Sequence, residues 1–252
     1  MTSKERIRIK DPIEVDILRK AGKILISIIE EIKGSLTVGM TTKAVDERAE
    51  AIIKKYNVLP AFKGYRGFPG CICISVNEEV VHGVPSQRVI QEGDIVSLDV
   101  GIICDDYYSD TAVTVAMGRV TPEIDRLLSV TKTALHKGIE QARVNNHLSD
   151  ISYAVQSFVE MHGFSVVRDF VGHGIGRQLH EEPEIPNYGK PGQGPVLREG
   201  MVLAIEPMVN TGTHRTRVLK DKWTVVTEDG KPSAHFEHCI VITSNGPEIL
   251  TR

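Results

Sequence analysis

The segment 171–183, with the sequence VGHGIGRQLHEEP, places two histidines among three glycines and next to two acidic residues. Histidine binds metals and transfers protons near neutral pH, so His173 and His180 are candidates for both kinds of chemistry. The glycines weaken helix and strand alike, which favours a close approach of the backbone to a ligand or a metal. We therefore expect this segment to form one wall of a functional site.

The same segment does not match the common phosphate-binding loops. Its glycines follow a G-x-G-x-G pattern that continues with Arg177, and Gly-Lys-Ser or Gly-Lys-Thr does not occur in the chain. The segment also lacks the H-E-x-x-H pattern of helical zinc proteases, because Glu184 stands where the second histidine would be. Any further ligands must come from other parts of the fold.

Two aspartates interrupt consecutive strand-like segments, 95–103 and 107–117. If these strands form a hairpin whose loop is centred between residues 104 and 105, Asp99 lies directly opposite Asp110 on one face. Two like charges in such a position destabilise a sheet. Three interpretations stay open: a cation binds between the carboxylates, one carboxyl group is protonated, or one aspartate lies at an exposed edge and pairs with a lysine.

Two glutamates stand beside apolar strand-like runs in the same way. Glu206 follows the run 201–205, and Glu237 precedes the run 239–242. Taken singly, each could be a surface residue at the end of a strand. Together, two aspartates, two glutamates and a histidine would supply an oxygen-rich set of ligands with one nitrogen. Such a set suits two hard or borderline divalent ions that share bridging carboxylates.

Composition sets broad limits. The chain of 252 residues is 41% hydrophobic, which permits one large domain or two small ones, and we favour one. Its net charge of -3 and pI near 6.3 speak against a specific nucleic-acid partner. The amino terminus lacks the apolar core of a signal peptide, and no apolar run approaches the roughly 18 residues of a membrane span. We expect a cytoplasmic protein that does not bind membranes.

The cysteine pattern fits that compartment. The pair Cys71 and Cys73 is too close for the C-x-x-C spacing of structural zinc sites, and Cys104 and Cys239 do not form a second such pair. We predict that all four are buried free thiols.

Periodicity and capping signals predict the elements that must position these residues. Helices are expected over residues 12–34, 42–56, 122–139 and 149–163. Further strands are expected over residues 72–76, 164–167, 201–206, 223–227 and 236–242, and a surface loop over 188–195. Two helices followed by strands thus occur twice. We predict one catalytic domain over residues 1–252, with a tail of about residues 1–10 and duplicated halves of about 11–118 and 119–252.

Six segments together carry a resemblance to a known family. They are FPGCICISVNEEVVHGVP, GDIVSLDVG, YYSDTAV, VGHGIGRQLHEEP, GMVLAIEPMV and FEHCIVIT. In this order they resemble the type I methionine aminopeptidases, from about residue 11 to the carboxyl end. No amino-terminal zinc-binding extension and no large insert is apparent, as in the short bacterial members. The resemblance implies the α+β pita-bread fold, with two pseudo-symmetric halves and a curved, mostly antiparallel sheet around a dimetal centre.

The resemblance also assigns roles to individual positions. It implies a metal site in which Asp110 and Glu237 bridge the two ions, made of Asp99, Asp110, His173, Glu206 and Glu237. It implies that His82, His180 and Glu206 act on the substrate, Glu206 as the proton shuttle. The residues implied in substrate binding are Tyr65, Phe68, Cys73, His82, His180 and Trp223. Phe62 and Leu179 stand at pocket positions where bacterial members commonly carry cysteine and phenylalanine, so the pocket shape is expected to differ there.

The implied reaction is hydrolysis that removes the initiator methionine from nascent polypeptides, near the ribosome exit, when the second residue is small. Two divalent ions are implied as cofactors, and the ligand set does not choose among Mn, Fe(II), Co and Zn. Nothing in the sequence demands more than a monomer. Two alternatives remain: an Xaa-Pro aminopeptidase on the same fold, and a non-catalytic relative that uses the fold for binding.

Overall fold

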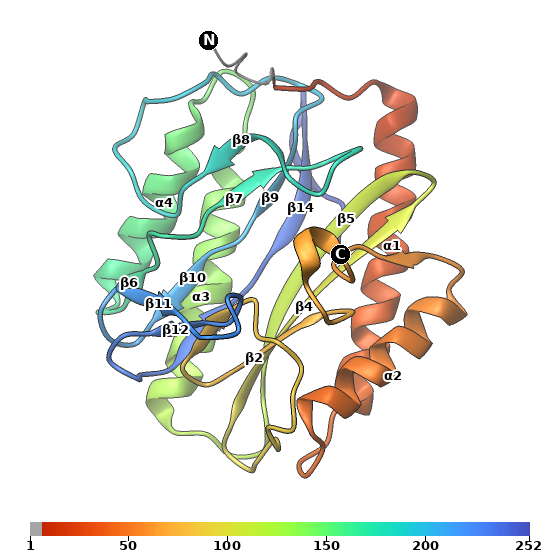
Figure 1. Ribbon diagram of the computed structural model, residues 1–252. Helices are drawn as coiled ribbons and strands as arrows, with labels where there is room; N and C mark the ends of the chain where they lie inside the picture. Colours follow the sequence, from red (N-terminus) through yellow and green to blue (C-terminus); the bar gives the residue numbers. More distant parts are fainter. Residues whose placement is uncertain (1–6) are drawn as a thin grey trace.

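The computed structural model describes residues 7–252 (Figure 1). The helices are α1 (Pro12–Ser35), α2 (Thr42–Lys55), α3 (Pro122–Gln141) and α4 (Leu148–Met161), with a short 3-10 turn η1 (Tyr65–Gly67). The strands of the first half are β1 (Leu59–Pro60), β2 (Cys73–Val76), β3 (Glu79–Val81), β4 (Ile95–Cys104) and β5 (Tyr107–Ala116). The remaining strands are β6 (Ser165–Val166), β7 (Gly172–Gly174), β8 (Glu181–Ile185), β9 (Val202–Ile205), β10 (Met208–Asn210), β11 (Thr216–Val218), β12 (Val225–Thr227), β13 (Ser233–His235), β14 (His238–Thr243) and β15 (Gly246–Ile249).

All four predicted helices form, and α1 and α3 begin with the predicted capping residues. The side chain of Asp11 accepts a hydrogen bond from the backbone N–H of Glu14, and the side chain of Glu14 accepts one from the backbone N–H of Asp11, so a capping box opens α1. Thr121 caps α3 in the same position relative to a proline. Helix α4 begins one residue earlier than predicted and ends at Met161. The apolar stripe predicted for α2 is buried, but the stripe predicted for α1 is only partly correct, because Ile13 is 73% exposed and the buried face of α1 runs through Leu18, Leu25 and Ile32.

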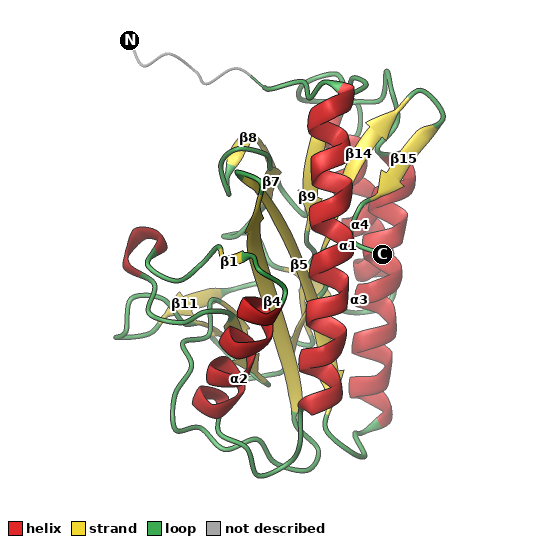
Figure 2. Ribbon diagram, turned by 90° about the vertical axis from the view of Figure 1, so that its right-hand side faces the viewer, coloured by secondary structure: helices red, strands yellow, loops and turns green. Residues whose placement is uncertain are grey.

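The strands lie between two pairs of helices. In Figure 1, α1 and α2 stand on one side of the molecule and α3 and α4 on the other, with β4, β5, β9 and β14 between them. Figure 2 shows α1 and α3 along one side of β4, β5 and β9, with β14 seen beyond α1 in this view. Strand β4 pairs with β1, β2 and β5, whereas the second half forms the sheet β15-β14-β9-β7-β8. Two short three-stranded sheets, β13-β10-β6 and β11-β12-β3, complete the arrangement.

The register of the β4–β5 hairpin corrects one prediction. The turn is centred between Asp105 and Asp106, both with positive φ, as a two-residue turn of the favoured hairpin type requires. Asp99 therefore pairs with Ala112, and Asp110 pairs with Gly101. The predicted direct opposition of the two aspartates is wrong by two residues. Because side chains alternate with a period of two, this shift keeps both aspartates on the same face as diagonal neighbours.

Four groups of buried apolar residues form the core of the described residues. One packs α3 and α4 against strands of the second half, one packs α1 and α2 against β2 and β4, and two join the two halves. The four cysteines are buried and free, as predicted. Part of the predicted tail lies outside the described residues, but Lys10 within it is buried and its backbone N–H donates to the Gly200 carbonyl. Among residues 7–252, no helix is long and apolar enough to cross a membrane.

Candidate metal centre and substrate cavity

One cavity of about 490 Å³ brings together every residue that the sequence singled out for the site. The potential metal ligands that line it are Asp99, Asp110, His173, Glu206 and Glu237. The other predicted residues that line it are Phe62, Tyr65, Phe68, Cys73, His82, Leu179, His180 and Trp223. The strands β4 and β5 contribute the aspartates, β7 contributes His173, and the glutamates flank β9 and β14.

The most compact part of the cavity wall consists of Asp110, His173 and Glu237. All three are buried, and each offers a ligand atom within 4.8 Å of the others. The ring nitrogen Nδ1 of His173 lies 2.9 Å from the Gly174 carbonyl oxygen. Because a carbonyl only accepts, Nδ1 carries the proton and Nε2 keeps a free lone pair. That Nε2 lies 3.5 Å from Oε1 of Glu206, so the lone pair faces the carboxylates.

These carboxylates lack the partners that buried charges need. Oδ1 of Asp99, Oδ1 of Asp110 and Oε1 of Glu237 are buried without a hydrogen-bond partner. Among the described residues, no lysine or arginine forms an ion pair with any of these three or with Glu206. An uncompensated buried charge is expensive, so the free oxygens indicate a neutralising partner other than a side chain.

The pKa values of these groups are shifted because burial disfavours their charged forms. Burial, opposed in part by His235, raises the pKa of Asp99 to about 6. Burial raises the pKa of Glu206 to about 8. Burial and the neighbouring carboxylates raise the pKa values of Asp110 and Glu237 well above the usual range. Burial lowers the pKa of His173 to about 3, which keeps the imidazole neutral. Four oxygen donors and one neutral imidazole fit hard or borderline divalent ions.

The glycines of the 171–183 segment serve a purpose other than the predicted one. A Cβ atom at Gly172 would collide with the Ala204 carbonyl, and one at Gly174 would collide with the Glu182 carbonyl. The glycines therefore let β7 pack closely between β8 and β9. The expected close approach to a ligand or metal is wrong for these two positions, because the approaching atoms belong to neighbouring strands.

His180 lies in the loop that follows β7, beside the metal-ligand candidates. Its ring centroid is 4.3 Å from that of His173, and its Nδ1 lies 2.9 Å from the hydroxyl of Tyr65. Desolvation by the surrounding loop and the Arg66 guanidinium lower the pKa of His180 to about 4. With Nδ1 engaged by Tyr65, the Nε2 atom is the one available to a ligand in the cavity.

His82 stands in a strained backbone conformation with φ of 58°. A positive φ is costly for a residue other than glycine, and such strain concentrates at functional sites. The ring packs edge-on against Phe170 at 5.5 Å and Trp223 at 6.4 Å between centroids. Burial and the neighbouring His235 and His180 lower its pKa to about 4.

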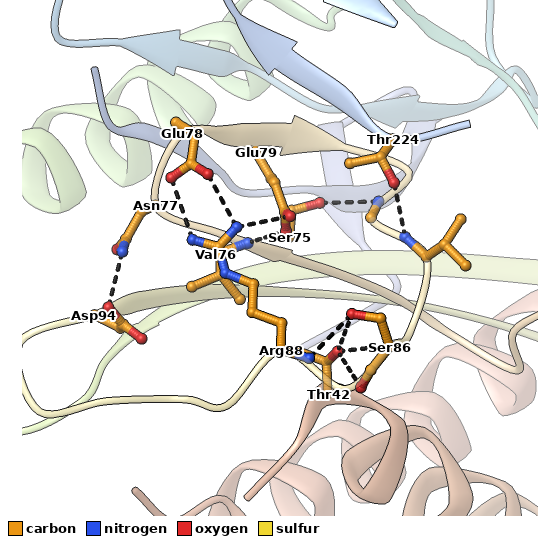
Figure 3. A network of polar contacts seen from close by, with 12 residues as sticks. Thr42, Ser75, Val76, Asn77, Glu78, Glu79, Ser86, Arg88, Asp94 and Thr224 are labelled. Carbon is orange, nitrogen blue, oxygen red and sulfur yellow. Dashed lines mark hydrogen bonds and ion pairs between the residues drawn. The ribbon is translucent and has the colours of Figure 1, made fainter. Parts of the chain in front are cut away.

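A polar network fixes the segment that contains β2, β3 and the turn between them and that leads into His82 (Figure 3). The Arg88 guanidinium bridges the carboxylates of Glu78 and Glu79, at 3.0 and 2.7 Å. The second oxygen of Glu79 accepts from the backbone N–H of Val76 at 2.7 Å. The hydroxyl of Thr224 accepts from the backbone N–H of Val84, two residues beyond His82. These contacts hold the chain on both sides of the strained residue.

An apolar region adjoins the carboxylates. Phe68 and Trp223 meet edge to face at 5.2 Å between ring centroids. Phe62 is buried over Gly101, where a Cβ atom would lie 2.6 Å from the Phe62 ring. Leu179 is also buried beside this region. The two residues that depart from the common bacterial pattern therefore contribute to the wall of the pocket.

Sequence reasoning missed His235, which lies on β13. Its side chain is fully buried, and its Nε2 lies 3.4 Å from Oε2 of Glu206 without a hydrogen bond. Counting back two residues from Glu237 along an extended chain points to this position, because alternate residues share a face. Phe170 and Arg66 also line the cavity and carried no motif signal.

Comparisons with known proteins agree with this arrangement. The model of metallopeptidase family M24 matches residues 16–244. A methionine aminopeptidase of Clostridium acetobutylicum is 51% identical over 97% of this chain and 98% of its own length. Methionine aminopeptidase 1 of Bacillus subtilis is 51% identical over 96% and 98%. The crystal structure of methionine aminopeptidase from Thermotoga maritima superposes with a TM-score of 0.96 at 50% identity, over 98% of this chain and all of that one.

The chain therefore belongs to metallopeptidase family M24 and has the pita-bread fold predicted from the sequence. Within that family it groups with the methionine aminopeptidases of the bacterial type. Prolidase from Pyrococcus furiosus shares the fold at a TM-score of 0.80, but it is only 25% identical and the match covers 66% of that longer chain.

Proposed function

We propose that this protein is a metal-dependent aminopeptidase that hydrolyses the peptide bond after an N-terminal methionine when the next residue is small. One observation carries the proposal: three buried carboxylates, the nearly buried carboxylate of Glu206 and a neutral imidazole meet in one cavity that apolar side chains also line. The near-complete match to bacterial methionine aminopeptidases supports the same reaction.

In this proposal, the five candidate ligands would hold two divalent ions, and Asp110 and Glu237 would contribute to both. The compact grouping of these two residues with His173 and the free carboxylate oxygens support this assignment. When bound, such ions stabilise hydroxide and the charge that develops on oxygen, so that water attacks near neutral pH. The donor set does not distinguish Mn, Fe(II), Co and Zn.

The remaining roles belong to the chain's own side chains. Glu206 holds and passes a proton between the attacking water and the leaving amine, because its carboxylate lies deep in the cavity beside His173. His180 places its free Nε2 toward the scissile carbonyl oxygen, where a hydrogen bond strengthens as charge develops. His82, which has the strained φ of 58°, contacts the backbone of the substrate peptide. The methionine side chain occupies the apolar region around Phe68 and Trp223.

Both halves of the chain contribute to this centre: Asp99 and Asp110 come from the first and the other ligands from the second. We therefore infer one catalytic domain made of two halves, acting as a monomer, because the cavity wall is built within a single chain. We further infer that its substrates are nascent chains near the ribosome exit, in the cytoplasm.

A peptide comparison tests the proposal against its alternatives. The metal-supplied protein should release methionine from Met-Ala-Ser and leave Leu-Ala-Ser and Ala-Pro-Ser almost uncut. Faster cleavage of Ala-Pro-Ser would favour the Xaa-Pro aminopeptidase. Binding of these peptides without cleavage of any would favour a non-catalytic relative.

A further inference from the structure

A buried ion pair links the amino-terminal segment to the wall of the cavity. The ammonium group of Lys10 lies 2.6 Å from Oε2 of Glu181. The side chains are only 5% and 4% exposed, so this pair is far better shielded from water than the surface pairs of the chain. Glu181 directly follows His180, the proposed substrate-contacting residue.

Glu181 also ties together the loop that carries His180. Its second oxygen accepts a hydrogen bond from the backbone N–H of Gln178 at 3.2 Å. The backbone N–H of Gly176 in turn donates to the Gln178 carbonyl at 3.2 Å. Oε1 of Glu181 also lies 4.0 Å from the guanidinium group of Arg8, whose side chain is half exposed. The carboxylate thus contacts two cations, of which only Lys10 is buried with it, and the loop backbone, and these contacts fix residues 176–181 as a unit.

The backbone and the aliphatic stem of Lys10 are also held in place by neighbouring residues. Its backbone N–H donates to the Gly200 carbonyl at 2.8 Å. A Cβ atom at Gly176 would lie 2.6 Å from Cε of Lys10, so the lysine stem packs directly on the loop. The ammonium group can therefore hold Glu181 in one position, whereas a lysine on the surface would be too flexible to do so.

Taking two charges out of water is costly, and buried pairs seldom add stability over apolar residues of similar size. A pair retained at such a place needs another reason. We propose that Lys10 is a positioning residue that acts through Glu181 to fix the loop of His180, and so sets the turnover of the reaction proposed above. This inference rests on the proposed function, since it assigns Lys10 a part in that reaction.

The first test is the variant Lys10→Met, which keeps the stem and removes the charge. We expect kcat for Met-Ala-Ser to fall about 10- to 100-fold, because small displacements of a catalytic group cost that much, while KM changes little. Lys20→Met is the matched control: Lys20 forms an exposed pair with Asp105 at 2.8 Å and should leave kcat unchanged. A kcat for folded Lys10→Met within twofold of the unaltered protein contradicts the proposal.

A double-mutant cycle separates positioning from a general structural role. If Lys10 acts through His180, then adding Lys10→Met to His180→Ala should lower kcat no further. Effects that multiply in the double variant overturn the proposal. Hydrogen exchange in metal-free protein gives a readout besides activity: Lys10→Met should speed exchange at the Gln178 amide, and Lys20→Met should not.

If Lys10→Met does not fold, the double variant Lys10→Met/Glu181→Leu serves as the test instead. It removes both charges of the buried ion pair, so neither is left buried without the other. We expect this double variant to fold, to exchange the Gln178 amide faster and to turn over slowly. Unaltered exchange and kcat in it would refute a positioning role. Failure of the unaltered protein to release methionine would instead refute the proposed function, and the exchange experiment would still report on the loop.

Discussion

Removal of the metal should make the stability of this protein depend on pH in a way that the buried carboxylates dictate. In chelator-treated protein, Glu206 has no cation to favour its charged form, and burial raises its pKa to about 8. In the unfolded chain the same group titrates near its ordinary value of about 4.3. The folded state therefore holds a proton that the unfolded state has already lost at neutral pH.

Proton linkage determines whether this raised pKa makes the folded state more or less stable as the pH rises. A carboxyl group whose folded pKa is raised contributes stability that is full below its unfolded pKa and is lost as the pH rises through its folded pKa. For a folded value of about 8, the loss between pH 7 and pH 9 is on the order of 1 kcal/mol, roughly one factor of ten in the folding equilibrium. Asp110 and Glu237, with pKa values also raised, act in the same direction.

Urea unfolding of metal-free protein at pH 7 and pH 9 measures this loss. Buried thiols also weaken the folded state over this range, since burial raises the pKa of Cys71 to about 12. The variant Glu206→Gln keeps those thiols and removes the carboxyl group, so between the two pH values it should lose less stability than the unaltered protein, by on the order of 1 kcal/mol. Equal losses in the two proteins would refute the reasoning about Glu206.

Three further perturbations follow from the site. Asp110→Asn should abolish methionine release and lower the metal content measured by elemental analysis, because the proposed bridging charge is gone; normal turnover in this variant would sink the two-metal assignment. His180→Ala should lower kcat about 10²- to 10³-fold in steady-state assays, as loss of a donor to a developing oxyanion does, with metal content unchanged; a kcat near normal would remove His180 from the reaction. Gly101→Ala should cost about 1 to 3 kcal/mol in urea unfolding, because the new methyl group meets the ring of Phe62; an unchanged midpoint would mean that the pocket wall yields without strain.

The sequence predicted the parts of the fold that depend on local signals. The caps at Asp11 and Thr121 and the apolar stripes behind them placed α1 and α3 to within a residue or two at their starts. The long strands β4 and β5 were also found, because apolar and polar residues alternate through the middle of β4 and because both runs are long and rich in residues that favour strands.

The short strands and the exact register of the β4–β5 hairpin were harder to predict from the sequence. Strands such as β3, β10 and β13 have three residues each, too few for periodicity to appear, and tertiary pairing alone defines them. The β4–β5 turn was misplaced because the left-handed conformations of Asp105 and Asp106 are not evident from residue type alone.

The same distinction applies to the site. Motifs located the five candidate ligands, but not the contacts that orient them. His235 lies on a short strand without a motif, and the pairing of Lys10 with Glu181 joins residues 171 positions apart. Contacts of this kind depend on how the two halves close on each other, which spacing along the chain does not encode.

Metal reconstitution shows whether the buried carboxylates hold divalent ions that support cleavage after an N-terminal methionine. Chelator-treated protein should release no free methionine from Met-Ala-Ser, and addition of at least one among Mn, Fe(II), Co and Zn should restore release. Absence of release with every one of these metals, in protein shown to be folded, would contradict the claim.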